Sequence, residues 1–122
     1  EERDHAMMMR KYLIDSGIRV TFDKIEKPDK TFDNHLAPLE AGLEHERYVT
    51  SLVLKIYKAA DEAQDYKTMQ FLDWFVKEQG EEEKNAEDLI KKMKLYGGDG
   101  KGLYMLNQEL AARKYTAPSA AE

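Results

Sequence analysis

Apolar residues recur at three- and four-residue steps along most of the chain, and this period predicts an all-α fold. We expect helices over residues 1–16, 36–63, 66–95 and 102–114. The stretch between the first two breaks the period. There "GIRVTFDKI" alternates apolar and polar residues, which favours extended backbone, and the turn-rich "EKPDKTFDN" follows. The pattern therefore predicts a helical protein with one long non-helical crossover.

The connections between the helices limit their arrangement. About 18 extended residues at roughly 3.3 Å each reach on the order of 60 Å, against about 42 Å for a helix of about 28 residues. The helices on either side of the crossover can therefore lie parallel. The short "AQDY" instead makes helices 36–63 and 66–95 antiparallel neighbours, with Asp65 as the expected N-cap. The glycines of "YGGDGKG" end the third helix, and residues 115–122 are expected to form a flexible tail.

Three of the predicted apolar seams are interrupted by carboxylate, amide or imidazole side chains. Glu2 and His5 stand three residues apart on one helix face. Glu46 interrupts the seam of the second helix, and Gln79 with either Glu82 or Glu83 interrupts the third. A carboxylate in a dry core costs several kcal/mol unless it is paired, and the same seam positions carry no Lys or Arg. A bound cation would compensate this cost.

Composition narrows the kind of cation and the class of protein. The 122 residues are enough for one domain, and the net charge of −5 argues against nucleic acid as the main partner. The sequence has no cysteine, which excludes disulfides, thiolate metal sites and thiol nucleophiles. No apolar run approaches the length of a membrane span. Carboxylate and imidazole ligands suit iron, manganese or zinc.

Ordinary structural roles compete with this interpretation. A single Glu-x-x-His arises by chance in many helices, and a Glu run such as 81–83 is commonly a solvated face. The three methionines at 7–9 are better explained by packing than by a soft-metal site. His35 lies at a helix start and His45 lies off the seam, so surface or interface roles are favoured for both. The coincidence of polar interruptions in three helices nevertheless favours a metal site, because apolar residues set the phase of each helix.

The order of several motifs resembles bacterial non-haem ferritins over nearly the whole chain. These motifs are "EERDH", the long crossover, "HER", "QDYKTMQFLDWFVKEQGEEEK" and "GGDGKGLYMLNQEL". The resemblance implies a ferritin-like four-helix bundle with a long crossover and a short fifth helix. It further implies a cytoplasmic homo-oligomer, a hollow shell of 24 subunits. Such a shell would oxidise Fe(II) with dioxygen or hydrogen peroxide at a di-iron centre and store Fe(III) mineral, with no role for nucleic acid or membrane.

The same resemblance assigns roles to individual residues of the di-iron centre. It implies that Glu2 bridges the two irons and that His5 is the imidazole ligand of the first iron. Glu46 and Glu82 would hold the second iron, with Gln79 beside it. These five residues are also the catalytic residues of the expected ferroxidase.

A third iron site near the di-iron centre is implied as well. Its ligands match Glu1, Glu78 and Glu81, with Glu82 shared between the two sites. This assignment favours Glu82 over Glu83 as the seam residue, and Glu83 is then expected to face outward.

The sequence also departs from the family pattern. The family's first helix and most of its second have no counterpart, and no cap precedes Glu1, so the chain is expected to be the C-terminal portion of a subunit. Two explanations stay open: a fragment, or a chain completed by another polypeptide. The alternative functions are an assembly-competent subunit with impaired ferroxidase activity and a rubrerythrin-like peroxidase. The latter class usually carries a cysteine-ligated iron domain.

Haem is not expected. Bacterioferritins bind it through a Met directly after the Glu of the first Glu-x-x-His, and Arg3 stands there in this sequence. The second Glu-x-x-His of those proteins is absent as well, because Glu78 and Glu82 are followed at three residues by Glu81 and Asn85.

Overall fold

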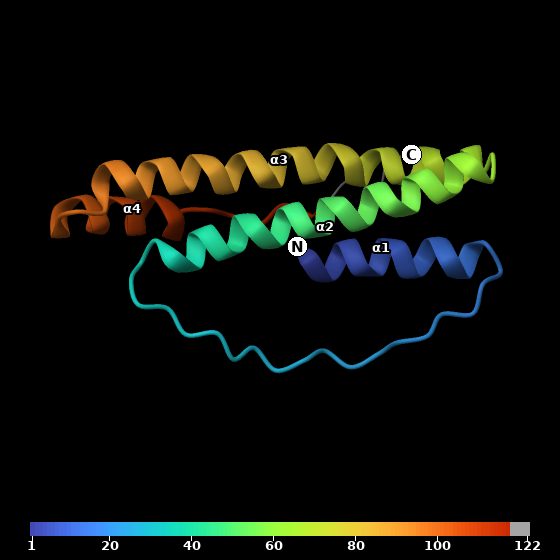
Figure 1. The fold of residues 1–122 in the computed structure, drawn as a ribbon, viewed down its shortest axis with the longest axis horizontal. Helices are drawn as coiled ribbons and strands as arrows, with labels where there is room; N and C mark the ends of the chain where they lie inside the picture. Colours follow the sequence, from blue (N-terminus) through green and yellow to red (C-terminus); the bar gives the residue numbers. More distant parts are fainter. Residues whose placement is uncertain (118–122) are drawn as a thin grey trace. The chain divides into compact units, whose positions relative to one another are not determined.

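The computed structural model describes residues 1–117, and its regular structure is entirely helical over that range (Figure 1). The helices are α1 (Glu2–Asp15), α2 (Ala37–Glu62), α3 (Tyr66–Tyr96) and α4 (Gly100–Ala111). The predicted all-α fold is confirmed, with the first three helices ending within a residue or so of the expected positions. None of these helices combines the length and apolar character that a membrane crossing requires.

The chain divides into two compact units. The first unit comprises Glu1–Lys30 together with the C-terminal segment from Leu110, and the second comprises Thr31–Glu109. The predicted flexible tail at 115–122 falls partly on residues 118–122, which lie outside the described residues. Residues 113–117 contain no helix, and the hydroxyl of Tyr115 donates a hydrogen bond to the Asp4 carboxylate within the first unit.

In the first unit, α1 ends where the sequence indicated. Gly17 has φ +73°, a conformation that glycine adopts without strain. Its N–H donates to Ile14, and the N–H of Ile18 donates to Leu13 at 2.9 Å, which is the pairing of a Schellman cap. Residues 18–32 then contain neither helix nor strand, so the predicted non-helical crossover is confirmed. Asn34 ends it in the second unit, where its side chain accepts from the N–H groups of Leu36 and Ala37 at 2.9 Å.

The second unit is built on the hairpin of α2 and α3, which lie side by side (Figure 1). Polar contacts join them in antiparallel order, because positions that rise along α2 meet positions that fall along α3. The contacts are Tyr57–Asp73 at 3.0 Å, Thr50–Glu83 at 2.6 Å, Arg47–Glu87 at 2.9 Å and Glu40–Lys94 at 3.3 Å. The antiparallel packing predicted from the short connection is therefore confirmed.

The core of the hairpin follows the predicted seams. The seam of α2 runs through Leu36, Leu39, Leu43, Glu46, Thr50, Val53, Tyr57 and Ala60. All eight are buried or half-buried, with Val53 and Ala60 the most enclosed. On α3, Leu72, Phe75 and Ile90 are buried, and the ring of Trp74 meets that of Phe75 edge to face at 4.9 Å. Apolar periodicity thus fixes the rotational phase of both helices, and with it the side on which their polar interruptions lie.

The short helix α4 begins earlier and ends earlier than the predicted 102–114. It begins at Gly100 because the Asp99 carboxylate accepts from the N–H of Gly102 at 2.8 Å and caps the first turn. Gly102 is buried against the end of α3, where a Cβ would overlap the carbonyl oxygen of Tyr96. An ion pair between Lys92 and Glu109 joins the two helices further along.

We expect Asp65→Ala to destabilise the hairpin, whereas Asp65→Asn retains the cap. The Asp65 carboxylate accepts from the Thr68 N–H at 3.0 Å and from its hydroxyl at 2.5 Å, which confirms the predicted N-cap. These hydrogen bonds lower the pKa of Asp65 below its model-compound value of 3.8. The stabilisation by the Asp65 carboxylate is therefore complete above pH 3.8, and it is lost as the pH falls through the lower pKa of the folded state. Thermal melts should show Asp65→Ala lower by a few degrees at neutral pH, and this gap should close in acid.

Replacing two helical glycines by alanine should give effects of opposite sign. Gly102→Ala should destabilise by on the order of 1–3 kcal/mol, because its Cβ meets backbone that cannot yield. Gly80→Ala, on α3 with open space around the new Cβ, should stabilise by about 1 kcal/mol through helix propensity alone. Urea unfolding of the two variants checks this. Equal shifts would contradict a close contact at Gly102.

Candidate metal centre

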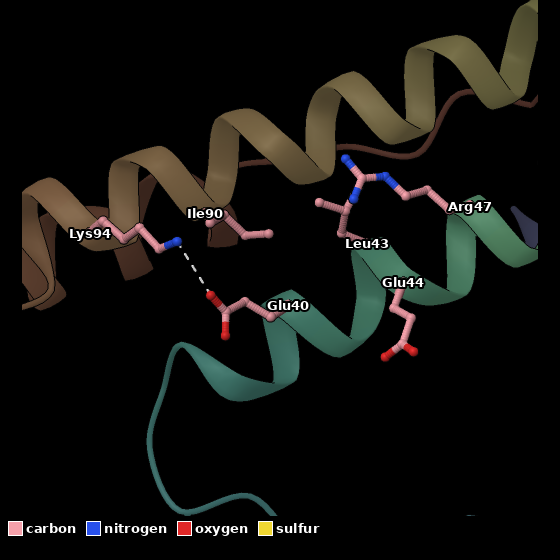
Figure 2. Close-up of a pocket in the computed structure, with 6 residues that line it drawn as sticks. All are labelled: Glu40, Leu43, Glu44, Arg47, Ile90 and Lys94. Carbon is pink, nitrogen blue, oxygen red and sulfur yellow. Dashed lines mark ion pairs between the residues drawn. The ribbon is translucent and has the colours of Figure 1, made fainter.

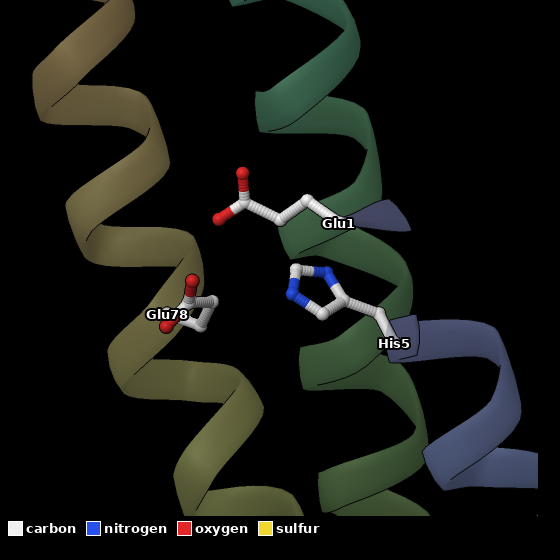
Figure 3. A group of neighbouring side chains, drawn as sticks. All are labelled: Glu1, His5 and Glu78. Carbon is white, nitrogen blue, oxygen red and sulfur yellow. The ribbon is translucent and has the colours of Figure 1, made fainter. Parts of the chain in front are cut away.

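The predicted ligands of the first unit gather on the first turn of α1. The N–H of His5 donates to the carbonyl of Glu1, so the two residues lie one turn apart. A carboxylate oxygen of Glu1 and a ring nitrogen of His5 lie within 4.8 Å of each other. Figure 3 draws both side chains leaving the same side of the helix. Glu2 Oε2 lies 3.6 Å from His5 Nδ1, although the Glu2 side chain is 78% exposed. Both carboxylates therefore share the side of α1 from which the imidazole projects.

In the second unit, α2 and α3 bring Glu46 and Gln79 into direct contact. Gln79 is only 6% exposed, and its Nε2 lies 3.2 Å from three acceptors. The acceptors are Glu46 Oε2, the Glu46 carbonyl oxygen and Thr50 Oγ1. An amide nitrogen carries two protons, so at least one of them is shared. The predicted polar interruptions of the two helices thus meet at one point inside the hairpin.

The remaining predicted ligands lie along α3 around that contact. Glu78, which Figure 3 also draws, and Glu82 are half-buried and one turn apart. Glu81 is exposed and pairs with Lys77 at 3.7 Å on the outer side of the helix. Carboxylate oxygens at this spacing, beside a buried amide, supply the hard donors that iron, manganese or zinc accepts.

The prediction that Glu83 faces outward is wrong. Its side chain is 28% exposed, and Oε1 accepts from the Thr50 hydroxyl at 2.6 Å. The Nε of Arg47 lies 4.0 Å from Glu83 Oε2. Glu83 turns toward α2 because Thr50 offers a donor there and Arg47 a positive charge.

Sequence reasoning did not assign roles to Thr50 and Arg47. Thr50 follows Glu46 by one helical turn and so shares its face of α2, but nothing in the sequence indicates that its hydroxyl bonds to the facing helix. Arg47 flanks the seam, so the absence of Lys and Arg from the seam positions did not reveal a positively charged side chain beside these carboxylates. Its guanidinium pairs with Glu87 at 2.9 Å and stays 57% exposed. The only available signal was the adjacency of Arg47 to Glu46 in "HER".

A pocket of about 360 Å³ lies along the same hairpin, toward the start of α2 (Figure 2). Leu43 and Ile90 supply its apolar surface, and Lys94 forms an ion pair with Glu40 across it. Glu44 and Arg47 complete the lining. None of these six residues belongs to the predicted ligand set, so the pocket and the candidate centre are separate features.

Comparisons with known proteins identify the family of this chain. The Ferritin family, described as a ferritin-like domain, matches residues 1–96. The chain belongs to the ferritin family. It is 34% identical to a bacterial non-heme ferritin of Campylobacter jejuni over 88% of this chain and 65% of the relative. It is 36% identical to a bacterial non-heme ferritin of Staphylococcus epidermidis over 94% of this chain and 69% of the relative.

Solved ferritin structures support the same conclusion about the fold. An open-pore ferritin from Archaeoglobus fulgidus is similar with a TM-score of 0.88 and 37% identity, over 90% of this chain and 68% of that one. The predicted ferritin-like helical fold is thereby confirmed. The chain spans 65% of the length of the Campylobacter relative.

We expect Gln79→Glu to destabilise the metal-free protein at neutral pH by on the order of 2 kcal/mol. The change replaces a buried donor by a second carboxylate beside Glu46. Repulsion raises the pKa of the introduced carboxyl, so the penalty grows as the pH rises through that value. It vanishes below the unfolded-state value of about 4.3. Melting curves with and without Zn²⁺ check this. Added Zn²⁺ should restore stability, whereas Gln70→Glu on the exposed side of α3 should show neither effect.

Proposed function

We propose that this protein is an iron-storage protein that oxidises Fe(II) at a di-iron carboxylate centre. The observation that carries the proposal is the contact of the buried Gln79 amide with the half-buried Glu46 carboxylate, in a chain of the ferritin family. Two apolar side chains at these positions would stabilise the hairpin at least as well as this polar pair, without the cost of desolvating it. A cation held at this point gives the arrangement a use. The relatives from Campylobacter jejuni and Staphylococcus epidermidis are both named bacterial non-heme ferritin, which supports the proposal.

Each predicted ligand has a role in this proposal. Glu2 bridges the two irons, and His5 binds the first through a ring nitrogen. Glu46 and Glu82 bind the second iron, and the Gln79 amide lies beside it. Glu1, Glu78 and Glu81 form a third site that shares Glu82. The first-turn position of Glu1, Glu2 and His5 on α1 and the one-turn spacing of Glu78 and Glu82 on α3 support these roles.

The donor set suits oxidation as well as binding. Anionic oxygen ligands stabilise Fe(III) more than Fe(II), since the ferric ion is harder and more highly charged. Two Fe(II) ions supply two electrons, which with two protons reduce dioxygen to hydrogen peroxide or hydrogen peroxide to water. Fe(II) is the substrate here, and the Fe(III) product accumulates as mineral inside a homo-oligomeric shell, for which we propose 24 subunits.

One experiment tests the proposal against its alternatives. Fe(II) oxidation and particle size are measured on the same sample, by Fe(III) absorbance and by size-exclusion chromatography with light scattering. Oxidation by a large hollow particle that retains iron supports storage. A large particle without oxidation indicates assembly with impaired ferroxidase activity. Oxidation by a small species that retains no mineral would contradict the proposal and favour a di-iron enzyme of another kind.

We expect Glu46→Ala and Glu82→Ala to slow Fe(II) oxidation about tenfold or more without unfolding the protein. Loss of the Glu46 carboxylate leaves Gln79 Nε2 bonded to the Glu46 carbonyl and to Thr50, so the amide stays satisfied. Removing a carboxylate from the seam also relieves its desolvation cost. Stopped-flow oxidation and thermal melts check both statements.

The matched control is Glu62→Ala, an exposed carboxylate on α2 that pairs with Lys58 at 3.8 Å. It should oxidise Fe(II) at the wild-type rate. If Glu46→Ala or Glu82→Ala melted several degrees lower while oxidising normally, that residue would be structural and its assignment wrong.

A further inference from the structure

The polar contacts of Gln79 continue into a chain of hydrogen bonds across the α2–α3 hairpin. Thr50 Oγ1 lies 3.2 Å from Gln79 Nε2 on one side and 2.6 Å from Glu83 Oε1 on the other. The Arg47 guanidinium lies near the second carboxylate oxygen of Glu83, at 4.0 Å. This series of hydrogen bonds therefore runs from the buried Gln79 amide, through the Thr50 hydroxyl, to the Glu83–Arg47 ion pair at the edge of the hairpin.

The direction of each bond in this chain follows from its outer end. The Glu83 carboxylate beside Arg47 only accepts, so the single proton of the Thr50 hydroxyl points to Glu83. Thr50 then offers only lone pairs to Gln79, which must turn its Nε2 toward them. The flipped amide would place Oε1 against Thr50 and two oxygens of Glu46, where no donor is left for it. The Gln79 Oε1 atom is thereby held facing away from this group of acceptors.

We propose that Thr50 is a positioning residue that fixes the Gln79 amide with Oε1 presented to the bound cation. The inference rests on the proposed function, since it deepens the description of the same centre. When the Glu46 carboxylate turns to a cation, the Glu46 carbonyl and Thr50 remain as acceptors for the two protons of Nε2. Without the Thr50 hydroxyl the amide is held by the carbonyl alone, and its hard oxygen donor loses its orientation.

Direct binding of the cation by Glu83 is the competing explanation. One oxygen of Glu83 is occupied by the Thr50 hydroxyl, and the other faces Arg47. A guanidinium at that place also repels a second cation. Both observations favour an indirect role for Glu83, in which it sets the direction of the Thr50 hydroxyl.

Titration with Co²⁺ in place of Fe(II), followed by visible absorption on the full chain, tests the inference without oxidation chemistry. Thr50→Val keeps the shape of the side chain and removes the hydroxyl, and we expect it to weaken Co²⁺ binding roughly tenfold. Thr50→Ser keeps the hydroxyl and should bind within about twofold of wild type. The control is Ser51→Ala. The Ser51 hydroxyl donates to the Tyr48 carbonyl and takes no part in the hydrogen bonds that link Gln79, Thr50 and Glu83, so this variant should bind Co²⁺ like wild type.

A double-mutant cycle with Glu83→Ala separates the two roles of Glu83. That change should weaken Co²⁺ binding in the wild-type background and have no further effect in Thr50→Val, because the hydroxyl that Glu83 directs is then absent. Equal weakening in both backgrounds would show direct binding by Glu83 and overturn the inference. Wild-type affinity in a folded Thr50→Val protein would overturn it as well. A wild-type protein that binds no Co²⁺ would instead refute the proposed function, and this inference with it.

Discussion

The hydrogen bonds of the buried Gln79 amide are the constraint on which the second unit depends. The Gln79 side chain is only 6% exposed, so each proton of Nε2 needs an acceptor within the protein. A buried donor without an acceptor would cost more folding free energy than the packing of an apolar side chain provides. The acceptors come from Glu46 and Thr50, one turn apart on the facing helix. Burial of the apolar seam sets the rotation of α2 about its axis, and satisfying these hydrogen bonds fixes its axial register against α3.

The other contacts of the hairpin are consistent with that register. The contact of Tyr57 with Asp73 lies on one side of the amide, and the ion pair of Glu40 with Lys94 lies far on the other. Exposed pairs of this kind add little stability individually, since water screens them and long side chains lose entropy. These pairs instead favour one axial register of the two helices, because each pair can form only in the register that the Gln79 hydrogen bonds require.

The placement of positive charge bears directly on function. Arg47 and Lys94 approach the hairpin from its edge, and each is paired with a glutamate, Glu87 and Glu40 respectively. Glu46, inside the hairpin, receives a neutral amide donor instead. A neutral partner satisfies the carboxylate without neutralising its charge, so the negative charge remains available to a metal ion. A lysine or arginine in place of Gln79 would have occupied the carboxylate permanently. The hairpin therefore satisfies the Glu46 carboxylate in the metal-free state and leaves its negative charge in place.

The sequence by itself determined the helices, their phases and the positions at which polar side chains enter the seams. Apolar period fixes these features because burial of apolar surface dominates the packing of a helix. Glu46 and Gln79 were identified in this way, whereas the cap at Asp65 followed from its residue type and its place in the short connection. Only the tertiary structure showed that Glu83, and not Glu82 alone, turns toward the facing helix. Adjacent helical positions differ by about 100° of rotation, so both border the same seam. The Thr50 hydroxyl and the Arg47 charge on the facing helix turned Glu83 inward, and no pattern within α3 contains that information.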